Sequence, residues 1–317
     1  MRKRGLFIVM CMVLAITLNG CGSSNSEPTK QPVSVSEKSK DTTQAETEVE
    51  KEESKMKETE VETTTAPKEE ISLPEQEIYN QDGLLVKVTG FNTDGSWGPE
   101  VKLFFENTGD KNVTIQPRNC SINGYMMDFQ MSCDVAAGKK ANDEMNISTR
   151  DLEQCGIETI SDIEFSLHIF DTDNYDGITD SDIIQLKTTG SENYTQTYDD
   201  SGDILYDANN IKIVSKGLVE SDYSIGPEFY MYIENNSDSG ITIQVRNTSV
   251  NGFMIDASMS CDILPGKKAV DDMTFFSSDI ESNGIEEIED IETSFHIFSL
   301  DGYDTIADSE PIVISFK

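Results

Sequence analysis

The residues with the clearest chemical capacity form an acidic stretch, HIFDTDNYDGITDSD, at positions 168–182. Oxygen ligands suit calcium, and an EF-hand loop needs them at positions 1, 3, 5, 9 and 12, with a glycine at position 6. Counted from Asp171, positions 3 and 12 hold Asp173 and Asp182, but Tyr175 stands at position 5 and the glycine comes one residue late. The flanks also read as strands, so this stretch is not an EF-hand.

A second acidic stretch, SLDGYDTIADSE at 299–310, repeats the spacing of the first but lacks that glycine. Both keep the tyrosine and four acids: Asp173, Asp176, Asp180 and Asp182 in the first, and Asp301, Asp304, Asp308 and Glu310 in the second. These carboxylates can crowd one loop and bind calcium weakly, or form a solvated loop tip, which is the reading we favour. We expect no other cofactor. A calcium-induced rise in melting temperature, lost in the Asp176→Ala, Asp304→Ala double variant, would support the calcium hypothesis.

The two histidines of the chain, His168 and His296, occupy equivalent positions in these two regions. Each lies in the middle of an expected strand without a second histidine, so we interpret them as hydrogen-bonded sheet residues and not as a base or ligand pair. No G-x-S-x-G, H-E-x-x-H, C-x-x-C or glycine-rich phosphate motif occurs in the folded region. We therefore predict no catalytic residues and a non-enzymatic protein, with an enzyme lacking a recognisable motif as an alternative.

Four cysteines fall in the region expected to fold. Cys133 and Cys261 are equivalent and are expected to pack as small apolar residues. Cys120 and Cys155 have no counterparts in the second region, so they can form a disulfide in an exported domain or remain two independent free thiols. The sequence leaves both alternatives open.

The N-terminus has the composition of a bacterial lipoprotein signal. Basic residues at positions 2–4 precede an apolar run at 6–18. This run is too short to span a bilayer, because a membrane-spanning helix needs ~20 residues. The sequence LNGC then ends at Cys21, in the pattern of a lipoprotein processing box. We expect a signal peptide over 1–20 and lipidation of Cys21, which anchors the protein to the outer face of the bacterial cytoplasmic membrane.

Residues 21–72 are rich in Ser, Thr, Glu and Lys and poor in apolar residues, so we expect a disordered tether. The formal net charge of the chain is −35, and its basic residues do not cluster beyond the first few positions. Nucleic acid is therefore excluded as a partner, because a phosphate backbone requires a basic surface.

The rest of the chain is a tandem duplication. The segment ENTGDKNVTIQPRNCSINGYMMDF begins at residue 106, and ENNSDSGITIQVRNTSVNGFMIDA begins at residue 234, an offset of 128 without a gap. We place the first copy at 73–189 and the second at 190–317.

Each copy reads as short strands with one helix. Residues 101–107 and 113–119 partly alternate apolar and polar residues around a turn, which predicts a hairpin. The Asn-Gly pairs in SINGYMMD and SVNGFMID predict type I′ turns, and STRDLEQCG at 148–156 predicts a short helix. In DIEFSLHIF, apolar residues fall on one face of a strand at 162–170. The size and punctuation of each copy predict an all-β fold with two tandem immunoglobulin-like β-sandwich domains.

With its lipobox, its acidic tether and the repeated blocks VTIQ/ITIQ, INGY/VNGF and AGKKA/PGKKA, the chain resembles surface lipoproteins of Gram-positive, Clostridia-type bacteria with tandem immunoglobulin-like domains. The resemblance spans nearly the whole chain and implies location and architecture, without an active site. We expect a monomeric extracellular binding or spacer module whose ligand is an unidentified extracellular protein or cell-wall component. A purely structural acidic stalk is the alternative.

Overall fold

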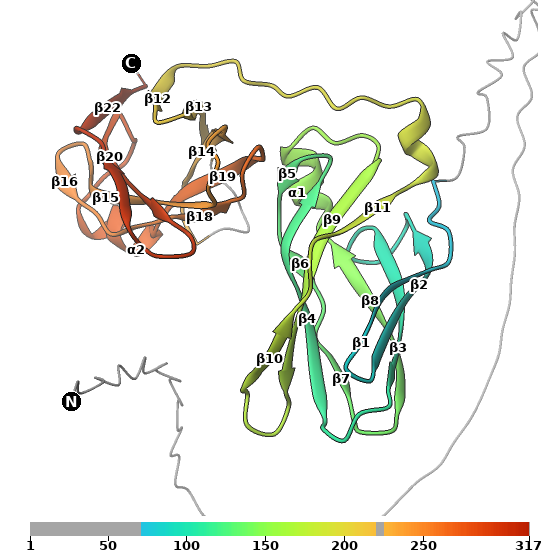
Figure 1. Ribbon diagram of the computed structural model, residues 1–317. Helices are drawn as coiled ribbons and strands as arrows, with labels where there is room; N and C mark the ends of the chain where they lie inside the picture. Colours follow the sequence, from blue (N-terminus) through green and yellow to red (C-terminus); the bar gives the residue numbers. More distant parts are fainter. Residues whose placement is uncertain (1–70, 220–224, 317) are drawn as a thin grey trace, which may run out of the picture. The chain divides into compact units, whose positions relative to one another are not determined.

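The computed structural model describes residues 71–219 and 225–316, and this part of the chain is built mainly of strands (Figure 1). The predicted signal peptide, Cys21 and all of the predicted tether except Ile71 and Ser72 lie outside the described residues. The two copies of the repeat contain the same elements in the same order.

The first copy comprises β1 (Gln76–Gln81), β2 (Leu84–Asn92), β3 (Glu100–Asn107), β4 (Val113–Ile122), β5 (Tyr125–Met126), β6 (Phe129–Gln130), β7 (Cys133–Val135), β8 (Lys140–Ile147), α1 (Thr149–Gln154), β9 (Asp162–Asp171), β10 (Gly177–Asp180) and β11 (Ile184–Lys187). A short 3-10 helix, η1 (Thr189–Glu192), follows.

The second copy comprises β12 (Ile204–Ala208), β13 (Ile211–Val219), β14 (Glu228–Asn235), β15 (Ile241–Val250), β16 (Phe253–Met254), β17 (Ala257–Ser258), β18 (Ser260–Ile263), β19 (Lys268–Phe275), α2 (Ser277–Ser282), β20 (Asp290–Ser299), β21 (Thr305–Asp308) and β22 (Ile312–Ser315).

Each copy divides its strands between two sheets, as a β-sandwich does. In the first copy one sheet has the order β1-β2-β3-β8-β6, and the other is centred on the β4–β9 pair, with β5 and β7 along β4 and β10 and β11 along β9. The second copy repeats this arrangement with β12-β13-β14-β19-β17 and with the β15–β20 pair. A single parallel bridge between β5 and β19, at Tyr125 and Lys268, joins the second sheet of the first copy to the first sheet of the second copy. The all-β sandwich-type fold predicted from the sequence is confirmed.

The core of each copy is formed by the inward faces of its two sheets. In the first copy, fully buried side chains from the first sheet meet those from the second: Val86, Val88, Val101, Leu103 and Phe105 on one side, and Ile115, Ile163, Phe165 and Leu167 on the other. The predicted inward face of β9 is confirmed. Removal of these apolar surfaces from water, at ~25 cal/mol per Å², is the main stabilising contribution to the fold.

The hairpin predicted from 101–107 and 113–119 is wrong, although both strands exist. β3 pairs with β2 and β8, whereas β4 pairs with strands of the opposite sheet, so the turn between them crosses the sandwich. The buried Asn107 holds this crossing, since its Nδ2 donates to the carbonyls of Lys111 and Val135 and its Oδ1 accepts from the Gly109 amide. Alternation predicts strands but not their partners, because pairing depends on contacts distant in sequence.

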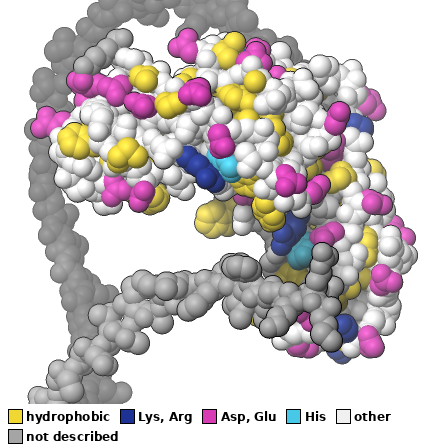
Figure 2. Space-filling model, turned by 60° about the vertical axis from the view of Figure 1, so that its left-hand side comes forward, with side chains coloured by type: hydrophobic (Ala, Val, Ile, Leu, Met, Phe, Trp, Pro, Cys, Tyr) yellow, Lys and Arg dark blue, Asp and Glu magenta, His cyan; other side chains and the backbone are white. Residues whose placement is uncertain are grey.

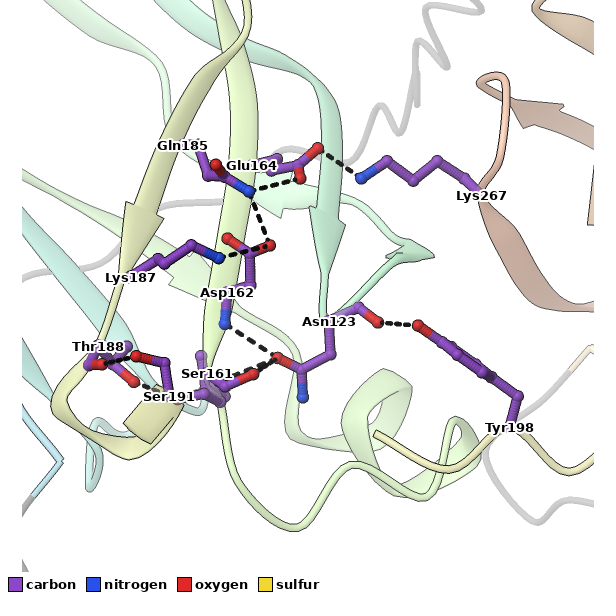
Figure 3. A network of polar contacts seen from close by, with 11 residues as sticks. Asn123, Ser161, Asp162, Glu164, Gln185, Lys187, Thr188, Ser191, Tyr198 and Lys267 are labelled. Carbon is purple, nitrogen blue, oxygen red and sulfur yellow. Dashed lines mark hydrogen bonds and ion pairs between the residues drawn. The ribbon is translucent and has the colours of Figure 1, made fainter. Parts of the chain in front are cut away.

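The predicted Asn-Gly turns are confirmed, and the asparagine of each turn also accepts hydrogen bonds from a distant segment of the chain. Asn123 and Gly124 both have positive φ values, 49° and 86°, and connect β4 to β5. Figure 3 shows the Oδ1 atom of Asn123 accepting from the backbone amides of Ser161 and Asp162 and from the Ser161 hydroxyl. Asn251 repeats this role, accepting from the amides of Glu289 and Asp290 at the equivalent place.

The helix predicted at 148–156 is confirmed as α1. The Ser148 hydroxyl accepts from the Asp151 amide at the N-terminus of the helix, and Gly156, with φ of 61°, follows the C-cap residue Cys155. A side chain at that φ is strained, so glycine is the favoured residue.

The end of the first copy is tied to its beginning. The Thr189 amide donates to the Ser72 carbonyl, and the Ser72 amide donates to the Thr189 hydroxyl. Residues 193–203, which the sequence assigns to the second copy, contain no strand, and the Tyr198 hydroxyl donates to the Asn123 carbonyl of the first copy (Figure 3).

Candidate binding face

The two copies present the same set of side chains on the outer face of the sheet centred on β4–β9 and β15–β20. In the first copy His168 and Phe170 alternate with inward residues along β9, and Tyr175 lies in the loop between β9 and β10. Their equivalents are His296, Phe298 and Tyr303. We call each set of three rings the aromatic row.

The rings of each row stand next to one another with modest tilts between their planes. In the first copy the His168 and Phe170 centroids are 5.5 Å apart at 34°, and the Phe170 and Tyr175 centroids are 6.2 Å apart at 28°. In the second copy the corresponding values are 5.2 Å at 34° and 6.1 Å at 31°. The tyrosine is therefore the outer end of a short stack, and its geometry is the same in both copies.

The tyrosine at the end of each row is exposed and held in an unfavourable backbone conformation. Tyr175 is 79% exposed with φ of 61°, and Tyr303 is 77% exposed with φ of 57°. This left-handed region costs a non-glycine residue roughly 1–2 kcal/mol. The Tyr175 amide donates to the Asp171 carbonyl and the Tyr303 amide to the Ser299 carbonyl, so both loops close in the same way. Each tyrosine ring stacks on the phenylalanine behind it, yet most of its surface stays exposed to solvent.

Polar side chains surround each aromatic row. His168 Nδ1 lies 2.6 Å from Asp180 Oδ1 on β10, and His296 Nδ1 lies 2.6 Å from Asp308 Oδ1 on β21. This is the cross-strand hydrogen bond expected of a sheet histidine. The carboxylates themselves are mostly exposed, 66% for Asp180 and 70% for Asp308, so they retain acceptor capacity toward solvent.

The next strand of the sheet continues this polar surface. Gln116 is in register with His168 and donates to the Ser132 hydroxyl, as Gln244 does opposite His296 toward Ser260. Beside them the Thr114 hydroxyl donates to Asp134 Oδ1 and the Thr242 hydroxyl to Asp262 Oδ1, both at 2.6 Å. These pairs fix the orientation of the polar groups around the rings.

An exposed arginine completes each face. Arg118 lies in register with Ser166, two pairs beyond Gln116 and His168 and on the same face of the sheet, and Arg246 holds the equivalent place. No ion pair links either guanidinium to a carboxylate of the part of the chain that the structure describes. Figure 2 shows both histidines at the molecular surface, each with acidic and basic side chains nearby. Each face thus offers donors and acceptors around an aromatic stack.

The calcium candidates are distributed around the β9–β10 and β20–β21 loops. Asp173 accepts from the Asn112 side chain, Asp180 and Asp308 are bonded to the histidines, and Asp176 is exposed. The remaining four candidates are also exposed: Asp182 follows β10, Asp301 and Asp304 lie in the loop between β20 and β21, and Glu310 follows β21. Within residues 71–219 and 225–316, no three His, Cys, Asp or Glu side chains are grouped to hold a metal ion. The calcium hypothesis stays a prediction.

All four cysteines between residues 71 and 316 are buried free thiols, including Cys120 and Cys155. In the structure Cys120 and Cys155 are two separate free thiols, which is one of the two alternatives that the sequence left open. Burial raises the pKa of each of the Cys120, Cys133 and Cys155 thiols to about 12, so they are protonated and unreactive at neutral pH.

The sequence pointed to the acidic residues around these loops and not to the aromatic rows. Its relevant signal was the tyrosine repeated 128 residues apart, together with the paired histidines. It did not contain the strand register that sets Gln116 of β4 beside His168 of β9.

None of the helices in the described ranges is long and apolar enough to cross a membrane. No protein-family model matches the sequence, and no curated protein matches it. One similar solved structure is the crystal structure of a protein of unknown function from Porphyromonas gingivalis W83, 11% identical, with 68% of this chain and 89% of that chain covered and a TM-score of 0.19. A likeness of that size carries no argument about function.

Proposed function

We propose that this chain is an exported, lipid-anchored, non-enzymatic binding protein, and that each copy uses its aromatic row to contact an extracellular ligand. Cys21 holds the lipid anchor at the outer face of the bacterial cytoplasmic membrane, and residues 21–72 carry the two domains away from it. The observation that carries this proposal is an exposed tyrosine with positive φ at the end of the same ring stack in both copies.

A structural stalk is the competing function, and the rows argue against it. A stalk needs stable domains and a soluble surface, which any polar residue at positions 175 and 303 would provide. Glycine or asparagine would also relieve the backbone strain there. The presence of a large exposed ring at both strained positions supports a contact of the ring with a ligand outside the fold.

Two copies increase the strength of such a contact. Once one row is bound, the second row meets its ligand at high effective concentration, which increases overall binding by roughly 10²–10⁴ over a single site. A ligand with repeated units gains most from this arrangement.

The test is retention of the purified full-length chain on isolated Gram-positive cell envelopes. We expect the Tyr175→Ala, Tyr303→Ala double variant to lose retention. The matched control is Trp97→Ala, Ile225→Ala, since these two residues are equivalent in the repeat, are 82% and 62% exposed, and lie outside the rows. Equal retention of the double variant and the native chain would contradict the proposal.

A further inference from the structure

We propose that the ligand of the aromatic rows is a neutral polysaccharide, whose pyranose rings stack on Tyr175 and Tyr303. This inference rests on the proposed binding function and names the class of ligand. It is argued from the form of the rows, from the polar groups around them, from the charge of the chain and from the duplication.

The form of the row suits a sugar ring. At 79% and 77% exposure, the outer faces and edges of Tyr175 and Tyr303 are open to solvent, while the phenylalanine behind each one supports it in a near-parallel position. The flat apolar face of a pyranose ring matches an aromatic face in size, and contact between them removes both from water. The support of the stack reduces the side-chain freedom that would be lost on binding.

The polar groups around the row suit hydroxyl groups. A sugar hydroxyl both donates and accepts hydrogen bonds, so its partner site needs both kinds of group. Asp180 accepts with its mostly exposed carboxylate, and Arg118 donates with a guanidinium that forms no ion pair with the described residues. Asp308 and Arg246 repeat this pair in the second copy.

The charge of the chain excludes polyanions as ligands. Residues 73–317 carry a formal net charge of −32, because the first twenty residues contribute +3 and residues 21–72 contribute −6 to the total of −35. A phosphate-rich or uronate-rich polymer would be repelled by this surface, and one arginine in each face does not offset that repulsion. A neutral glycan meets no such barrier.

The duplication favours a polymer with repeated units. Both copies keep the same three rings and the same His–Asp, Gln–Ser and Thr–Asp pairs, so they present the same site twice. Two equal sites are useful on a ligand that offers equal units in series, as a polysaccharide does. A peptide with one recognition motif would engage only one of them.

The experiment measures binding of the full-length chain to insoluble cellulose, chitin, xylan and starch, with purified teichoic acid as the anionic probe. We expect retention on at least one neutral polysaccharide and none on teichoic acid. A single Tyr175→Ala or Tyr303→Ala variant should bind about a hundredfold more weakly through loss of the second site, and the double variant should not bind. The Tyr175→Trp, Tyr303→Trp double variant should bind, unlike the double alanine variant, because an aromatic ring is kept at both positions. The Trp97→Ala, Ile225→Ala control should bind as the native chain does.

Three results would overturn the inference: no retention on any of the four neutral polysaccharides, retention that the tyrosine variants do not reduce, or salt-sensitive binding to teichoic acid. Treatment of the cell envelopes separates this inference from the proposed function. If the rows bind a glycan, periodate oxidation of the envelopes abolishes tyrosine-dependent retention and protease treatment does not. The opposite pattern would leave the rows as a binding face and identify a protein as the ligand.

Discussion

The left-handed conformation of Tyr175 and Tyr303 leads to an unusual stability order among variants. Replacing a residue with glycine normally destabilises a protein relative to alanine, because glycine loses more conformational freedom on folding. At φ of 61° and 57° the order should be reversed, since alanine keeps the steric strain of the left-handed region and glycine does not.

The magnitude follows from comparing two variants that both lack the ring. The ring contact with Phe170 or Phe298 is removed in each, so only the backbone difference remains, at about 1 kcal/mol per position. The two positions lie in separate copies and share no partner, so their effects should add. We expect the Tyr175→Gly, Tyr303→Gly chain to be about 2 kcal/mol more stable than Tyr175→Ala, Tyr303→Ala.

Urea unfolding measured by circular dichroism gives this difference. The control is the pair Trp97→Gly and Trp97→Ala, at an exposed position where φ is not positive and where alanine should be the more stable residue. An alanine variant at positions 175 and 303 as stable as the glycine variant would refute the argument that these tyrosines are strained. Both double variants should also fail to bind the ligand, so that the more stable chain is an inactive one.

Three further predictions concern the body of the sandwich. Asn235→Ala should destabilise the chain by about 3 kcal/mol in urea unfolding, because Nδ2 of this fully buried residue donates to two carbonyls. The control Asn236→Ala, on the surface, should change stability by less than about 0.5 kcal/mol, and equal effects of the two substitutions would contradict this prediction. Burial raises the pKa of Asp271 from 3.8 to about 6, so folding favours the protonated carboxyl. The stability of the chain is therefore unaffected by this group below pH 4 and falls as the pH rises through 6. Asp271→Asn should stabilise the chain by about 3 kcal/mol at pH 8 and by almost nothing at pH 4. A gain of the same size at both pH values would show that burial of charge is not the cause. The four buried thiols between residues 71 and 316 should resist iodoacetamide at pH 8 in the native chain and all react in urea, as mass mapping would show; an unreactive pair in urea without reductant would indicate a disulfide.

The fold class could be predicted because its determinants are local in sequence. Alternation in 162–170 gives the inward face of β9, the Asn123–Gly124 pair gives the turn after β4, and Ser148 with Gly156 delimits α1. Because similar segments recur 128 residues later, the same predictions apply to the second copy. Where the pattern left a choice of partner, as between β3 and β4, the sequence favoured the nearest strand and was wrong.

The candidate site could be predicted only in part, because its residues come from three strands and a loop. Loop sequence alone draws attention to the many carboxylates, whose abundance in so acidic a chain makes them unspecific. The tyrosines could be noticed as repeated, but their exposure and positive φ are properties of the folded loops. Neither can be read from composition.

By itself the sequence determined the all-β fold class, since turn residues and alternating apolar positions are each recorded within short windows, and its similar segments 128 residues apart predicted a tandem repeat. It also determined the strong negative charge that limits possible ligands. Only the tertiary structure decided that His168, Phe170 and Tyr175 form one stack, with Gln116, Arg118 and Asp180 around it. The physical reason is that strand register and loop backbone conformation set which side chains become neighbours, and both are fixed by packing across the whole sandwich.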